Sequence, residues 1–84
     1  MRHLIPVYHL ARKGLTPSGD ATFICYADLS MGRDLFSGRY RWKGDADKAT
    51  AFIDADFADF MAGEVSKAEG FKVETVITGF VERA

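Results

Sequence analysis

The segment from residue 45 to residue 63 constrains the fold most, because its apolar residues recur at helical spacing. On a projection of about 100° per residue they gather on one side, as expected of a helix packed on a core. This stripe comprises Ala46, Ala49, Thr50, Phe52, Ile53, Phe57, Phe60 and Met61. Asp45 suits the N-cap, and Gly63 suits a C-terminal cap just before Glu64 would enter the stripe. The sequence therefore predicts a helix that begins at Asp45, ends or bends near Gly63 and turns its phenylalanines inward.

Four other segments favour extended structure. Residues 2–12, 21–29, 35–43 and 71–82 are rich in β-branched and aromatic residues, and turn-forming residues separate the first three. Pro6 lies inside the first segment, which is typical of an edge strand. We therefore predict an α+β fold of one domain, residues 1–84, with the order β-β-β-α-β. Its antiparallel meander of about four strands would be covered on one face by one helix.

Composition narrows the class of protein further. The chain has 84 residues, is 48% hydrophobic and 13% aromatic, and carries a net charge of −1, as is typical of one soluble globular domain. It contains neither a long apolar run nor a signal-peptide pattern at Met1, so we expect a cytoplasmic protein that does not bind membranes. Its single cysteine, Cys25, lies among apolar residues and is expected to be a buried, inert thiol.

Charge is segregated along the chain. Residues 45–70 contain seven carboxylates and two lysines, whereas residues 1–44 contain seven lysines or arginines and three carboxylates. Such asymmetry in a small domain points to a partner or to self-association. We expect a larger protein or nucleoprotein complex with a basic surface. A homodimer, joined by the strand containing Pro6 or by a seam of alanines on the helix, is a further possibility.

The alanine seam lies on the outward side of the predicted helix. Ala51, Ala55, Ala58 and Ala62 form it, and Asp47, Asp54, Asp56, Asp59 and Lys48 flank it. Small side chains permit close approach, and the carboxylates can fix the orientation of a basic partner. Alanine also favours helices and aspartate favours solvated surfaces, so plain solvent exposure is the alternative interpretation.

A second candidate surface is the basic strand. Arg39, Arg41 and Lys43 alternate with Tyr40 and Trp42, a pattern that can contact phosphates and stack on bases. Strand alternation sends the two aromatic rings to the face opposite the cations, which favours a core role for the rings. We therefore rank a nucleic-acid site below a solvated basic strand paired across the sheet with Glu74 and Glu82.

Catalytic and metal-binding patterns are not recognisable in the sequence. His3 and His9 lie too far apart to hold one ion together, and no nucleophile has a base and an acid at a familiar spacing. We expect no cofactor, no metal and no enzymatic activity.

Two resemblances bear on function. The segment from Thr22 to Leu29, followed later by the helix predicted from Asp45, resembles the β-β-β-α-β half of HicB-type antitoxins. Ala27 stands in place of the family's proline, and the DNA-binding extension usual in that family does not follow the last strand in this sequence. The whole chain, by its size, acidic helix and small sheet, resembles phage-encoded anti-CRISPR proteins. That resemblance implies a non-enzymatic inhibitor in the host cytoplasm, with Asp47, Asp54, Asp56 and Asp59 placed in a basic channel of a nuclease complex. A nucleic-acid-binding or HicB-like antitoxin module is the alternative.

Overall fold

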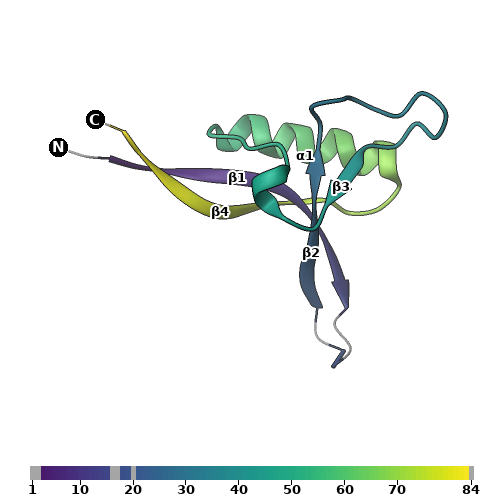
Figure 1. Ribbon diagram of the computed structural model, residues 1–84, viewed down its shortest axis with the longest axis horizontal. Helices are drawn as coiled ribbons and strands as arrows, with labels where there is room; N and C mark the ends of the chain where they lie inside the picture. Colours follow the sequence, from purple (N-terminus) through teal and green to yellow (C-terminus); the bar gives the residue numbers. More distant parts are fainter. Residues whose placement is uncertain (1–2, 16–17, 20, 84) are drawn as a thin grey trace.

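The computed structural model describes residues 3–15, 18–19 and 21–83. Its elements are β1 (His3–Leu15), β2 (Ala21–Asp28), β3 (Arg41–Lys43), a 3-10 helix η1 (Ala46–Lys48), α1 (Ala55–Glu69) and β4 (Glu74–Arg83). The four strands form one antiparallel sheet in the order β3-β2-β1-β4, with α1 following the third strand (Figure 1). The predicted α+β class and element order are confirmed.

β1 is shared by two ribbons that diverge. Its residues 3–11 pair with β4, and its residues 11–15 pair with β2. Among the described residues of β1, Ala11 alone pairs with a strand on both sides, opposite Glu74 in β4 and Tyr26 in β2. A β-bulge interrupts the register on each side of Ala11, and bulges increase local twist. The two ribbons therefore point in different directions, as Figure 1 shows.

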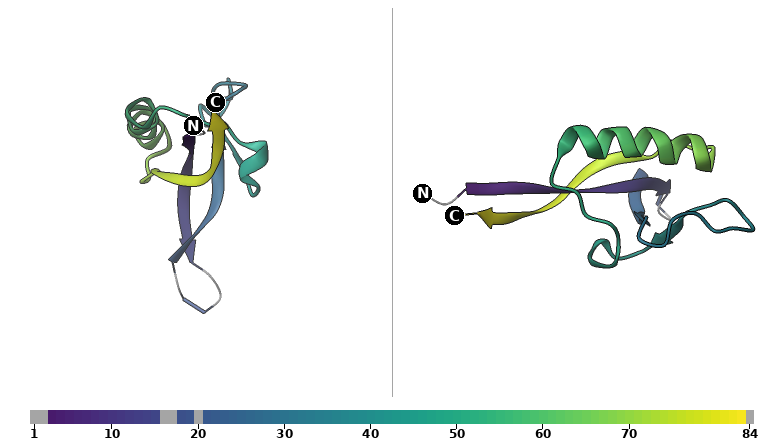
Figure 2. Two further views of the ribbon diagram at one scale, coloured as in Figure 1. Left: turned by 90° about the vertical axis from the view of Figure 1, so that its left-hand side faces the viewer. Right: turned by 90° about the horizontal axis from the view of Figure 1, so that it is seen from above.

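β4 lies beside β1, whereas a simple meander would place it beside β3. α1 carries the chain across one face of the sheet to the opposite edge (Figure 2). β1 is therefore an inner strand, and its prediction as an edge strand is wrong for the sheet as a whole. However, its residues 3–7 pair with β4 and have no second strand partner among the described residues. Pro6, which lacks an N–H group, lies in this one-sided part of β1. We call residues 3–7 and 79–83 together the arm.

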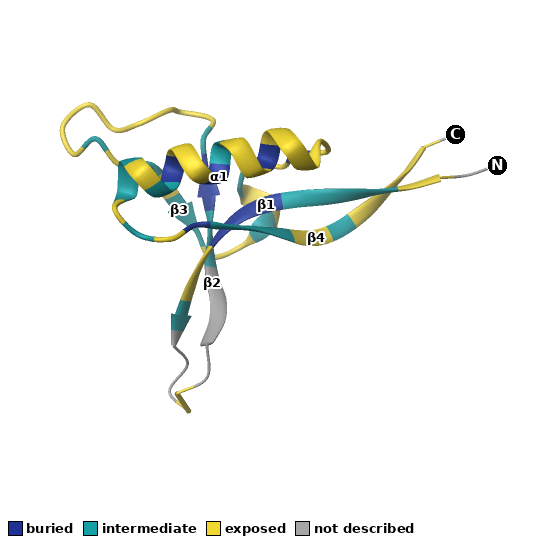
Figure 3. Cartoon of the chain, turned by 180° about the vertical axis from the view of Figure 1, so that it is seen from behind, coloured by how far each residue is buried: buried dark blue, intermediate teal, exposed yellow. Residues whose placement is uncertain are grey.

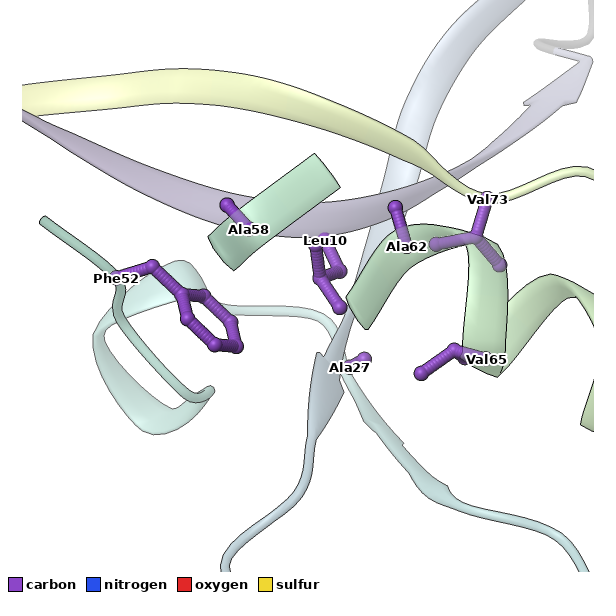
Figure 4. Packing of buried hydrophobic residues seen from close by; sticks show 7 residues of the cluster. All are labelled: Leu10, Ala27, Phe52, Ala58, Ala62, Val65 and Val73. Atoms are coloured by element: carbon purple, nitrogen blue, oxygen red, sulfur yellow. The ribbon is translucent and has the colours of Figure 1, made fainter. Parts of the chain in front are cut away.

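The core lies where α1 crosses β1. It comprises Leu10, Ala27, Phe52, Ala58, Ala62, Val65 and Val73 (Figure 4). Ala58 and Ala62 face the strands, because small side chains let the helix backbone approach them closely. The largest fully buried side chains are Leu10 and Val65, so the core is small even for a short chain. Figure 3 shows the buried residues of α1 on one side of the helix and exposed residues on the other.

The helix begins ten residues later than its sequence pattern predicts. Residues 49–54 are not helical, because other segments take up their backbone groups. The N–H of Thr50 donates to the carbonyl oxygen of Ala27 at 3.1 Å, and Phe52 forms an isolated antiparallel bridge with Tyr8. The predicted helix over residues 45–63 is therefore wrong in its first half. Asp45 does act as an N-cap, but of the short helix η1.

Capping residues fix both ends of α1. The side chain of Asp54 accepts a hydrogen bond from the N–H of Phe57 at 3.0 Å, which satisfies one unpaired donor of the first turn. Gly70 adopts a left-handed conformation with φ of +79° and ends the helix. Gly63, predicted to end the helix, lies inside it on the exposed side. Glu64 is exposed as well, because the buried side of α1 is not the predicted one.

β3 is also shorter than predicted. Residues 35–40 belong to a loop between β2 and β3, and only residues 41–43 form the strand. The turn expected between the segments 2–12 and 21–29 lies partly outside the described residues, and β1 itself continues to Leu15. Among the described residues, no helix combines the length and the apolar character needed to cross a membrane.

Candidate interaction surfaces

The outward side of α1 presents aromatic and acidic side chains together. Phe57 is 53% exposed and Phe60 is 60% exposed, although both were predicted to face the core. Asp56, Asp59 and Glu64 are exposed on the same helix. We call these five residues the α1 outer face. Phe57 and Phe60 face outward because Ala58, Ala62 and Val65 occupy the buried side of α1.

The predicted alanine seam is therefore divided. Ala51 and Ala55 are exposed, one before α1 and one at its first residue, whereas Ala58 and Ala62 are buried against the sheet. The prediction that Ala58 lies on a partner-binding surface is wrong. A dimer joined by the alanine seam is excluded by the same burial.

The predicted acidic residues remain at the surface, with different roles. Asp54 is occupied as the N-cap of α1, and Asp47 is exposed in η1. Asp56 and Asp59 are exposed, and neither forms an ion pair within the part of the chain that the structure describes. These two carboxylates are thus available to a basic partner. The ring of Phe57 packs near the ring of buried Phe52, with 5.8 Å between the two ring centroids. This contact helps to hold Phe57 in place.

The loop between β2 and β3 carries a second exposed apolar group. Leu35 is 97% exposed, and Phe36 beside it is fully exposed. The carboxylate of Asp34 accepts hydrogen bonds from the N–H groups of Phe36 at 2.9 Å and Ser37 at 2.8 Å. The Arg33 side chain donates to the carbonyl oxygen of Gly38 at 2.7 Å. These bonds order the turn that presents the two apolar side chains.

The side chains of the basic strand alternate as predicted. Tyr40 and Trp42 pack against the core, whereas Arg39 and Arg41 are exposed and Lys43 is half-buried. The expected pairing of these cations with Glu74 and Glu82 is wrong, because those glutamates belong to β4 at the opposite edge of the sheet.

Asp28 is the acid that faces the basic strand. It lies opposite Arg41 in the register of β2 and β3. Hydrogen bonds from the hydroxyl and N–H groups of Ser30 lower the pKa of Asp28, and the charges of Lys43 and Arg41 lower it further. Asp28 therefore stays ionised at neutral pH and offsets part of the positive charge that a phosphate would need.

Reactive groups are scattered. Burial raises the pKa of the Cys25 thiol, although the charge of Arg12 opposes this effect, so the nucleophilic thiolate is disfavoured at neutral pH. His9 is buried, and its Nδ1 lies 2.6 Å from the hydroxyl of Thr78. The described residues contain no cluster of three or more metal-binding side chains.

Comparisons with known proteins do not add to this picture. No protein-family model matches the chain, and no curated protein or solved structure is significantly similar to it. The class that the structure defines is a small α+β domain with a four-stranded antiparallel sheet and one helix.

Sequence reasoning missed the exposed aromatic residues of α1 and of the loop. A signal for α1 was present, since Asp54 is a good N-cap and Ala58, Ala62 and Val65 follow it at helical spacing. Beginning the helix at Asp54 instead of Asp45 selects this narrower stripe and leaves Phe57 and Phe60 outside it. For Leu35 and Phe36, the signal was Asp34 followed by Gly38, a pair typical of a turn.

Proposed function

We propose that this chain is a non-enzymatic binding protein, an inhibitor or adaptor, that docks the α1 outer face onto a larger protein. The observation that carries the proposal is that Phe57 and Phe60 are exposed beside the exposed carboxylates of Asp56 and Asp59. Aromatic side chains often dominate binding energy when a partner's pocket excludes water around them. Carboxylates at the rim select a basic surface around that pocket.

The position of α1 supports this use. The buried side of the helix is fixed on β1 and β4, and Asp54 and Gly70 cap its ends. The outer face is therefore presented by a rigid element, which lowers the entropy cost of binding. The acidic residues also make association sensitive to salt, because exposed charges are screened over about 10 Å at 0.1 M salt.

A binding assay with paired variants tests the proposal. The full chain is immobilised, partners are captured from the native host, and the captured protein is purified and titrated against each variant. Phe60→Ala is expected to weaken binding about 30-fold, equivalent to about 2 kcal/mol for a central aromatic residue. Asp56→Asn with Asp59→Asn should weaken binding at low salt and have less effect at high salt.

Leu35→Ala is the matched control, since Leu35 is even more exposed but lies in the β2–β3 loop. It should bind like the unmodified chain. A partner that tolerates Phe60→Ala but is lost with Leu35→Ala would contradict the proposal and assign binding to the loop. Binding to DNA or RNA below about 100 μM that disappears when Arg39, Arg41 and Lys43 become alanine would instead support the nucleic-acid alternative.

In its most specific form, the proposed function is that of an anti-CRISPR inhibitor. The support is the resemblance in size and layout, together with the exposed carboxylates of Asp47, Asp56 and Asp59. A cleavage assay with CRISPR nuclease complexes of the native host would test it. The unmodified chain is expected to inhibit cleavage when it is present in a stoichiometric amount. The double variant with Asp56→Asn and Asp59→Asn should not inhibit it. Unchanged cleavage would remove this form while leaving the broader proposal in place.

A further inference from the structure

The sheet has one long free edge. β3 and β4 are its outer strands, and β4 spans ten residues where β3 spans three. One side of β4 pairs with β1, and the other side meets no strand among the described residues. Unpaired N–H and C=O groups along such an edge form a template for another strand.

Two other free edges, those of β3 and of β1 in the arm, are less suited to pairing than the edge of β4. β3 is short and carries Arg41 and Lys43. The free side of β1 in the arm contains Pro6, which cannot donate a hydrogen bond. In contrast, residues 75–81 of β4 contain neither a charged residue nor a proline, and Phe80 and Val81 are exposed. The β-bulge in β4 falls between Ile77 and Gly79, so residues 79–83 form an uninterrupted stretch beyond it.

The total exposed surface of the chain is large enough to accommodate self-association. The chain exposes 5908 Å², which is about 900 Å² more than the roughly 5,000 Å² expected of a folded monomer of this mass. Its Cα radius of gyration is 13.7 Å, compared with about 12 Å for a compact domain of the same length. A standard stable interface buries about 800 Å² on each partner. The excess over the whole chain is therefore similar in size to the area that one protomer buries in a standard dimer.

Charge does not oppose self-association. The net charge of −1 means that two copies repel each other only weakly. A two-stranded ribbon such as the arm is marginal alone in water, and Leu4 and Phe80 are exposed on it. Addition of strands from a second copy would stabilise the arm.

We propose that the segment of β4 around Phe80 and Val81 pairs antiparallel with the same segment of a second copy, giving a two-fold symmetric dimer with one continuous sheet. A two-fold axis normal to the sheet places one residue opposite its own copy. Within this stretch, a centre at Phe80 or at Val81 brings exposed apolar side chains together across the strands. Pairing occurs in the plane of the sheet, whereas α1 covers a face, so the α1 outer face stays available.

Sedimentation velocity of the full chain over about 1 to 100 μM tests the dimer. The expected result is a dimer that dissociates on dilution. Phe80→Lys and Val81→Lys should each weaken self-association at least about tenfold, because a charged side chain disfavours edge pairing. Leu35→Lys is the matched control and should dimerise normally. Circular dichroism of each variant checks that the monomer fold is intact.

Cysteine cross-linking locates the contact even if a lysine variant fails to fold. In a Cys25→Ser background, single cysteines are placed at residues 79 to 82 and oxidised. Directly opposed residues of antiparallel strands have Cα atoms about 4.5 to 5.5 Å apart, within the range of a disulfide. Phe80→Cys or Val81→Cys should form a covalent dimer, and Leu35→Cys should not. A monomer at every concentration would overturn the proposal, as would efficient cross-linking at Phe60→Cys with none in β4.

Discussion

The backbones of Tyr8 and Phe52 exchange two hydrogen bonds. The N–H of Tyr8 donates to the carbonyl oxygen of Phe52 at 2.7 Å, and the N–H of Phe52 donates to that of Tyr8 at 2.8 Å. This bridge holds Phe52 beside β1 and outside any helix, and α1 begins only at Ala55. It also buries the Phe52 ring in the core.

Phe52→Ala should therefore strongly destabilise the protein. Removal of a buried phenylalanine ring leaves a cavity, and we expect the free energy of unfolding to fall by about 3 kcal/mol. Urea denaturation measures this change. Phe60→Ala is the matched control, since Phe60 is exposed, and it should cost less than about 0.5 kcal/mol. If Phe52→Ala and Phe60→Ala lowered the free energy of unfolding equally, the assignment of Phe52 to the core and Phe60 to the surface would be contradicted.

Two glycines of the same region should respond in opposite directions to alanine. Gly70 has φ of +79°, so Gly70→Ala should lower the free energy of unfolding by about 1 kcal/mol through backbone strain. Gly63 lies within α1, and a methyl group there would meet no atom within 4 Å apart from its chain neighbours and the adjacent helix backbone. Gly63→Ala should raise the free energy of unfolding by about 0.5 to 1 kcal/mol. Thermal and urea denaturation of both variants provide the comparison; stabilisation by Gly70→Ala would argue against the left-handed helix end.

The carboxylate of Asp54 should contribute to stability as a cap. Asp54→Ala removes the acceptor for the N–H of Phe57 and should cost about 1 kcal/mol in the free energy of unfolding. Asp54→Asn keeps an acceptor and should cost much less. Asp59→Ala, on an exposed side chain in the helix, is the control for lost charge. If Asp59→Ala destabilises the protein as much as Asp54→Ala does, capping is not the cause.

The loop turn should loosen in acid. The pKa of Asp34 lies below its usual range, because the N–H groups of Ser37 and Phe36 donate to its carboxylate. The pKa of Asp34 is lower in the folded chain than in the unfolded chain. The ionised carboxylate therefore stabilises the turn fully above the ordinary carboxyl pKa of about 3.9, and this stabilisation is lost as pH falls through the pKa of the folded chain.

Amide NMR shifts of Phe36 and Ser37 between pH 7 and about 2 would follow this transition. Both should move together, with a midpoint below about 3.9. Asp34→Asn keeps the side-chain oxygen but cannot ionise, so the transition should vanish in that variant. A midpoint at or above the ordinary value would show that the carboxylate is not held by these two bonds.

The sequence by itself determined the number and order of the main elements. Glycine and proline turns separate the first two β-rich segments, and the apolar periodicity within residues 45–63 predicts one helix between the third and fourth strands. Alternation along residues 39–43 also correctly placed Tyr40 and Trp42 toward the core. These features depend on neighbouring residues, so local sequence was sufficient to predict them.

Only the tertiary structure decided where α1 begins, which side of it is buried and which strand β4 joins. The stripe containing Phe52, Phe57 and Phe60 and the stripe containing Ala58, Ala62 and Val65 are both compatible with a helix. The hydrogen bonds of residues 50 and 52 to distant strands took Phe52 out of the helix, and close packing on β1 favoured the alanines. Such choices depend on residues more than forty positions apart in the chain. For that reason the aromatic residues expected to form the core became, in part, the exposed surface from which function is proposed.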